Sequence, residues 1–169
     1  MPDYVIDTNV LIIASAADSA SPFVDTALPA QEAERVLAWV ARFRVDNAAG
    51  MVWDQGFKLF DEYRKKLTGT DYGIRMLQHK LDTCRFRFVE VPYDDDGYGV
   101  IPERYHDFDR SDRSALAVLL AERGAATLVN AVDTDWLKIE RQLREDGIPF
   151  EHIVESWLRA KHAEKESRK

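Results

Sequence analysis

The sequence is short of cysteine. Its one cysteine, Cys84, excludes an internal disulfide and a zinc site built from cysteines. We expect Cys84 to be a small core residue. A chain without a disulfide suits a reducing compartment, so we expect a cytoplasmic protein. The sequence also has neither a basic, apolar leader nor a run of about 20 apolar residues, so we expect neither a secretory signal nor a membrane span.

Positive charge is in the minority, with 23 basic residues against 30 acidic ones and a formal net charge of −7. This balance argues against a protein that coats nucleic acid by bulk attraction, but it leaves room for a local basic path. Such a path is offered by Lys58, Arg64, Lys65 and Lys66, which could equally be the solvated face of a helix. The length of 169 residues and the 46% apolar content predict one folded domain spanning residues 1–169.

Apolar patterns alternate between the periods of strands and of helices along the chain. Short buried strands are predicted over residues 4–6, 51–53, 127–132 and 148–153, and an alternating strand over residues 85–91. Helices are predicted over residues 32–44, 55–67, 74–81, 111–123 and 134–146 and at the C-terminal end, with a long loop over residues 93–107. The alternation predicts an α/β fold of three layers, with a mostly parallel sheet flanked by helices.

Two acidic residues directly follow predicted buried strands. Sites in open α/β sheets lie beyond the carboxyl ends of the strands, where Asp7 and Asp133 are expected. Asp7 could simply cap a helix, although Thr8 and Asn9 could also do so. Asp133, like the neighbouring Asp135, could cap the next helix. The position of Asp7 is therefore the stronger indication of function.

Two more acids lie on predicted helices. Asp112 begins a helix, where the helix dipole alone would favour an acid, but its spacing to Leu116 places it on the apolar stripe. Glu62 borders an apolar face and could instead form an exposed pair with Lys66. Both residues are candidates for a site that faces the core.

A cluster of these carboxylates needs a counter-ion. Two carboxylates 4 Å apart repel by about 4 kcal/mol at an effective dielectric near 20, so the cluster must bind protons or a divalent cation. A set of oxygen ligands selects Mg²⁺ or Mn²⁺. Such ions activate water and neutralise charge on a transferring phosphate, which predicts phosphodiester hydrolysis.

The same residues carry a family resemblance. Tyr-Val-Ile-Asp7-Thr-Asn-Val-Leu-Ile, Leu-Phe-Asp-Glu62-Tyr, Asp112 at a helix start and Val-Asp133-Thr-Asp135-Trp resemble the PIN-domain nucleases in order and spacing. The match covers residues 4–153. Its strongest part is the opening strand with Asp-Thr-Asn.

The resemblance implies a PIN-like fold and a site for Mg²⁺ or Mn²⁺. Its ligands would be Asp7, Glu62, Asp112 and Asp133, with Asp135 as an auxiliary ligand and Asn9 or Thr8 orienting Asp7. It also implies an endoribonuclease acting on single-stranded RNA, often the toxin of a toxin–antitoxin pair with an antitoxin protein as partner, and commonly a homodimer.

The sequence departs from the family pattern and leaves alternatives open. Ala131, beside Asn130, stands where the family usually has Thr or Ser, and residues 14–31 and 93–107 look long. The loss of that hydroxyl favours a rival hypothesis, a PIN-like binding or assembly module with little or no turnover. A small phosphatase with Asp7 as nucleophile is a third alternative, but the sequence shows no basic residue at a strand end to hold the phosphate.

Overall fold

The computed structural model describes residues 2–20 and 28–168, and within them a five-stranded, fully parallel sheet forms the centre. Its strands lie in the order β3-β2-β1-β4-β5. They span β1 Asp3–Ile6, β2 Gly50–Asp54, β3 Phe86–Val89, β4 Ala126–Asn130 and β5 Phe150–His152. The predicted α/β fold is confirmed, and β1 occupies the middle of the sheet.

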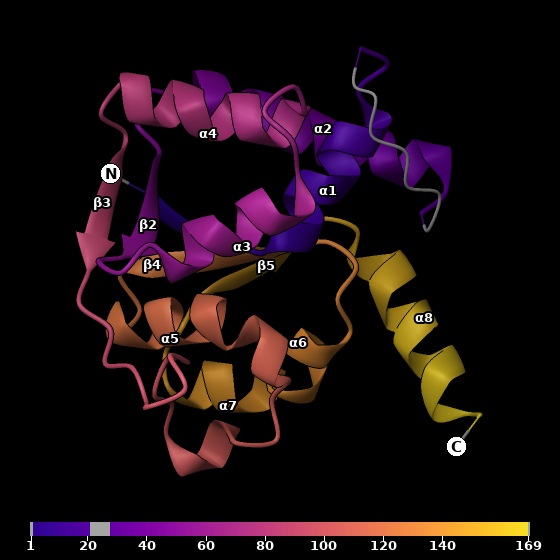
Figure 1. Cartoon of the computed structure of the whole chain (residues 1–169). Coiled ribbons are helices and arrows are strands. Elements are labelled where there is room, and N and C mark those ends of the chain that lie inside the picture. Colours follow the sequence, from indigo (N-terminus) through magenta and orange to yellow (C-terminus); the bar gives the residue numbers. More distant parts are fainter. Residues whose placement is uncertain (1, 21–27, 169) are drawn as a thin grey trace.

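Helices cover both sides of the sheet (Figure 1). On one side lie α1 Thr8–Ala17, α2 Ala30–Val45 and α4 Tyr72–Asp82, and on the other α5 Arg113–Ala121, α6 Asp135–Lys138 and α7 Glu140–Glu145. Helix α3, Lys58–Lys66, contacts β2, α1 and α5, and α8, Glu155–Glu166, extends from the body. Among the described helices, none has the length and apolar character needed to cross a membrane.

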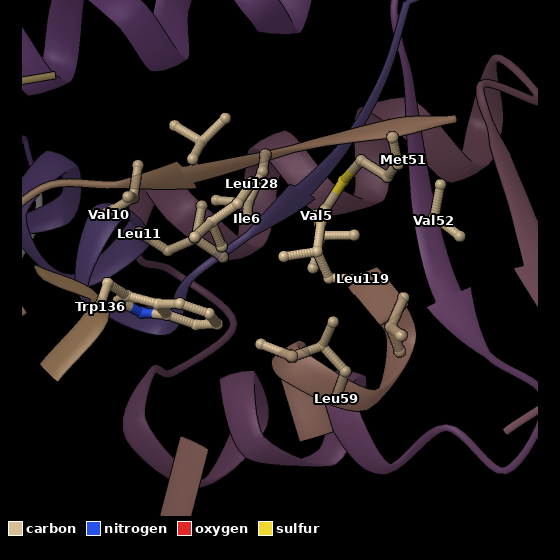
Figure 2. Close-up of a cluster of buried hydrophobic side chains, with 14 of the residues drawn as sticks. Val5, Ile6, Val10, Leu11, Met51, Val52, Leu59, Leu119, Leu128 and Trp136 are labelled. Atoms are coloured by element: carbon tan, nitrogen blue, oxygen red, sulfur yellow. The ribbon is translucent and has the colours of Figure 1, made fainter. Parts of the chain in front are cut away.

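The core consists of apolar side chains from the central strands and from helices of both layers. Figure 2 shows Val5 and Ile6 of β1 with Leu59 of α3, Leu119 of α5 and Trp136 of α6. All five side chains are fully buried. Burying a large apolar side chain contributes roughly 1.5–3 kcal/mol, so this packing holds the strand ends against the helices that follow them.

Two predicted helices begin later than expected, and a third is interrupted. The helix predicted over residues 55–67 begins at Lys58, because Phe57 takes a left-handed conformation with φ 58° and the Asp54 carboxylate accepts from the Lys58 amide at 2.8 Å. The helix predicted over residues 134–146 is broken at Ile139 into α6 and α7. The one predicted over residues 111–123 starts with a 3₁₀ turn, Arg110–Asp112, before α5.

Other expectations concern the connecting segments. Cys84 is exposed, which contradicts the predicted core position, because it lies in the turn between α4 and β3 with φ 55°. The loop predicted over residues 93–107 holds a bridge between Tyr93 and Gly99 and a 3₁₀ turn, Glu103–Tyr105. Of the long segment at residues 14–31, residues 21–27 lie outside the described residues.

Candidate metal centre

Three carboxylates meet beyond the carboxyl ends of the two central strands β1 and β4. Asp7 follows β1, Asp133 follows β4, and Asp112 precedes α5. One carboxylate oxygen of each lies within 4.8 Å of the others. Asp7 is only 5% exposed, and the other two side chains are half-buried. Asp133 lies 126 positions after Asp7 and reaches it because parallel strands end at the same edge of the sheet. Asp112 lies 105 positions after Asp7 and reaches it from the start of α5.

Asp7 is held on both of its carboxylate oxygens. Oδ1 accepts from the backbone amide of Asn9 at 3.0 Å and from its side-chain Nδ2 at 2.5 Å, while Oδ2 accepts from the indole Nε1 of Trp136. The bond to the Asn9 amide also makes Asp7 the N-cap of α1. The Asp7 side chain therefore caps α1 and also belongs to the carboxylate cluster.

Asn9 joins the turn after β1 to the turn after β4. Its Oδ1 accepts from the backbone amides of Ala131 at 3.0 Å and Val132 at 3.1 Å, and its Nδ2 donates to Asn130 Oδ1 at 3.1 Å. Asn130, fully buried, also accepts from the Asp133 amide at 3.2 Å and donates to the Asp133 carbonyl at 2.9 Å. The positions of Asp7 and Asp133 are thereby coupled.

Glu62 borders the three carboxylates but is not one of the three that meet. The Thr8 hydroxyl donates to Glu62 Oε1 at 2.7 Å, so Thr8 orients Glu62, and Asn9 alone of the two orients Asp7. The next residue, Tyr63, is fully buried and donates to the Ile6 carbonyl at 2.5 Å. This bond ties α3 to the end of β1.

Asp135 lies beside the three carboxylates rather than among them. Its backbone amide donates to Asp133 Oδ1 at 2.8 Å, and its own carboxylate forms an ion pair with Lys138. Its carboxylate is therefore already engaged with a basic side chain. The structure thus brings together Asp7, Asp112 and Asp133, with Glu62 and Asp135 at the border.

Burial and mutual repulsion disfavour the ionised form of the three carboxyl groups. Burial raises the pKa of Asp7 to about 7, helped by the charges of Asp133 and Glu62 and opposed by the bonds from Asn9 and Trp136. Burial followed by the charges of Asp7 and Asp133 raises the pKa of Asp112.

The pKa values of the two other acids rise for the same leading reason. Burial raises the pKa of Asp133, and the hydrogen bonds from the Asp135 amide and from Asp112 oppose this. Burial also raises the pKa of Glu62, against the hydrogen bond from Thr8 and the charge of Lys66. Binding of protons or of a cation would therefore relieve the repulsion among these four carboxylates.

The donor set fits a hard divalent cation. Carboxylate oxygens are the ligands that Mg²⁺ and Mn²⁺ prefer, and the half-burial of Asp112 and Asp133 would leave a bound ion open to water. The partners of Asp7 resemble the outer hydrogen bonds that orient ligands in metal sites. The trio of aspartates can therefore bind one such cation.

The basic residues expected to guide nucleic acid lie at the two ends of α3. Lys58 begins the helix, whereas Arg64, Lys65 and Lys66 end it, about 9–12 Å further along at 1.5 Å per residue. All four are exposed. Lys65 and Lys66 act on the charge of Glu62, so the C-terminal end of α3 is the part closest to the candidate site.

Two contributors were not predicted from the sequence. Trp136 entered the sequence motifs only as the residue after Asp135, and the sequence holds no other signal for its bond to Asp7. His152 is not part of any sequence motif described above, yet its Nδ1 bonds Asn130 Nδ2 at 3.1 Å. Both contacts depend on the packing of α6 and β5 against β4, which only the fold reveals.

No protein-family model, curated protein or solved structure matches the chain. The interpretation of the site therefore depends on its geometry and on the sequence motifs.

Proposed function

We propose that the protein is a metal-dependent endoribonuclease of PIN type that hydrolyses phosphodiester bonds of single-stranded RNA. The observation that carries this proposal is the trio Asp7, Asp112 and Asp133, whose carboxylates converge within 4.8 Å at the strand ends. The motifs around them, in the order and spacing of the PIN-domain nucleases, support the choice of RNA. Action as a toxin with an antitoxin partner, and a homodimeric state, are further predictions of that resemblance.

The reaction class follows from the donor set. A Mg²⁺ or Mn²⁺ ion bound by three carboxylates would activate a water and neutralise charge on the phosphate. Asn9 and Trp136 hold Asp7 in position for binding, and the Asn130 amide holds the turn of Asp133. Glu62, whose Oε1 accepts from Thr8 at 2.7 Å, would use Oε2 to accept the proton that this water gives up.

Calorimetric titration of Mn²⁺ into the metal-stripped protein tests the proposal without knowledge of the RNA target. We expect saturable binding by the wild type and its loss in Asp7→Asn, which removes a ligand charge at nearly constant volume. Asp95→Asn is the matched control, because Asp95 is an exposed aspartate in the loop after β3. It should bind like the wild type.

Cleavage of single-stranded RNA is then assayed with the same three proteins. Mn²⁺-dependent cleavage by the wild type and the control, but not by Asp7→Asn, is the expected result. If the wild type binds no Mn²⁺, or if Asp7→Asn binds it equally well, the metal site and the hydrolytic function are both wrong.

A binding or assembly module without turnover is the second candidate, and Ala131 favours it. The alanine side chain has no hydroxyl to offer to a water or a phosphate. The residue is fully buried, and its backbone amide donates to Asn9. A protein of this kind would bind RNA or a protein partner without cleaving RNA. Absence of Mn²⁺ binding together with intact folding would favour it.

A further inference from the structure

A separate cavity opens beside the candidate metal centre. It measures about 270 Å³ and lies between the 3₁₀ turn at residues 103–105 and helices α6 and α7. Its apolar wall is made by Tyr105, Phe108 and Ile139, which are at most 5% exposed. Sites for drug-sized ligands measure about 300–1,000 Å³, so this cavity suits a smaller group.

Two contacts connect the cavity to the carboxylates. Asp135 lines the cavity and donates its backbone amide to Asp133 at 2.8 Å. Phe108 also lines it and packs against Trp136 with ring centroids 4.6 Å apart, and Trp136 donates to Asp7. The cavity thus reaches Asp133 through one residue, Asp135, and Asp7 through two, Phe108 and Trp136.

Hydrogen bonds and ion pairs to the end of α7 hold Tyr105 and Arg104 in the cavity wall. The Tyr105 hydroxyl donates to Asp146 at 2.5 Å, and Arg104 bonds Asp146 at 2.8 Å and Glu145 at 2.7 Å. These bonds join the 3₁₀ turn to the end of α7. The cavity therefore exists before any ligand binds.

Two polar side chains on the cavity lining remain available to a ligand. Gln142, half-buried on α7, and Asp107, exposed before Phe108, have no hydrogen-bond partner among the residues that the structure describes. An amide both donates and accepts, whereas a carboxylate only accepts. Together with an aromatic wall, they suit the edge of an unstacked base that carries an amino group.

We propose that this cavity binds one nucleobase of a single-stranded nucleic acid next to the phosphodiester that the carboxylates act on, with preference for an amino-bearing base over uracil. The proposal rests on the proposed function for the identity of the ligand. Asp107 Oδ atoms accept from the exocyclic amino group, Gln142 bonds the neighbouring ring nitrogen, and Phe108 lies along the face of the base. In uracil the O4 carbonyl replaces that amino group, so an acceptor would face the Asp107 carboxylate, which also only accepts.

Fluorescence anisotropy with three labelled hexanucleotides of 2′-O-methyl RNA, made of adenine, cytosine or uracil, tests this preference. Binding is measured in EDTA and again with CaCl₂, so that base selection is observed apart from cleavage. We expect the uracil probe to bind at least about fivefold more weakly than the best probe, the lower end of the effect of one good base contact. Gln142→Leu and Asp107→Asn should each reduce the difference to less than about twofold.

Gln31→Leu is the matched control, since Gln31 is exposed on α2 in the other helical layer and should keep the preference. Equal binding of the three probes by the wild type, a preference that survives both cavity substitutions, or no binding in either buffer would overturn the proposal. Mn²⁺ binding and cleavage without base preference would leave the hydrolytic function standing and remove only the cavity assignment. Base preference without Mn²⁺ binding would support the cavity assignment and remove the hydrolytic function.

Discussion

The indole of Trp136 serves two purposes in one residue. It is fully buried in the core, and its Nε1 donates to a carboxylate oxygen of Asp7. Side chains that orient a metal ligand in this way typically change metal affinity by about 10–100-fold when replaced. The role of Trp136 is therefore separable from its packing.

Trp136→Phe keeps most of the apolar volume and removes the donor. We expect Mn²⁺ affinity, measured by calorimetry, to fall by about tenfold or more. Trp53→Phe is the control, because Trp53 is equally buried and its Nε1 has no hydrogen-bond partner within the described structure. If both variants lose affinity equally, the bond from Trp136 is not what positions Asp7.

At the scale of elements, helix α3 is positioned by a carboxylate that does not belong to the candidate metal centre. Asp54, at the end of β2, accepts from the amides of Lys58 at 2.8 Å and Leu59 at 2.9 Å and from the Tyr93 hydroxyl. It is 1% exposed. Helix α3 carries Glu62, so this cap also determines where Glu62 lies.

Asp54→Ala should lower the free energy of unfolding by about 1–2 kcal/mol through loss of the cap, and by more if the Tyr93 hydroxyl is left without a partner. Urea unfolding followed by circular dichroism measures this change. Tyr93→Phe removes the hydroxyl but keeps the cap, and should cost less than Asp54→Ala. A larger loss in Tyr93→Phe would show that the cap is not the main contribution.

At the scale of the whole molecule, the raised pKa values predict how stability depends on pH. The pKa of Asp7 is raised to about 7, and those of Asp112, Asp133 and Glu62 are also raised. Without metal, the folded protein therefore binds more protons than the unfolded chain above the unfolded pKa values near 4. Its free energy of unfolding should fall as pH rises from about 5 to about 7, by about 1.4 kcal/mol per pH unit for each excess proton.

Urea unfolding in EDTA between pH 5 and pH 8 tests this dependence. His152 acts in the opposite direction, because burial lowers its pKa, but it contributes one proton at most. Asp7→Asn should flatten the slope, and MnCl₂ at 100 times its Kd should add about 2.7 kcal/mol at pH 7. A metal-free wild type that is as stable at pH 7 as at pH 5 would contradict the assignment.

The molecule as a whole is acidic, so binding of RNA would depend on local positive charge. If Lys65 and Lys66 contact the RNA backbone, the double variant with both lysines changed to Glu should reduce the slope of log K against log salt by about 0.7 per lost phosphate contact. Arg35→Glu on α2 is the control, since Arg35 is 61% exposed and pairs with Glu32. An unchanged slope in the double lysine variant would exclude this path.

Much of this architecture could be predicted from the sequence, because strands and helices leave local patterns. The order of elements and the convergence of Asp7 with Asp133 followed from short apolar runs that end in acids. The break at Ile139 in the helix predicted over residues 134–146 depends on tertiary packing, and the start of α3 after Phe57 depends on one left-handed residue. The bonds of Asn9 to Asn130 and of Trp136 to Asp7 join residues more than 100 positions apart, which no local pattern reveals.

The exposed Cys84 has a practical use. It lies in the turn before β3, whereas the carboxylates lie beyond the opposite, carboxyl ends of the parallel strands. A strand of four residues such as β3 spans about 13 Å. Because the chain has one cysteine, a maleimide fluorophore attached there labels a single position away from the candidate site. The tumbling of that fluorophore would report the arrival of RNA or of a protein partner while every side chain of the site stays native.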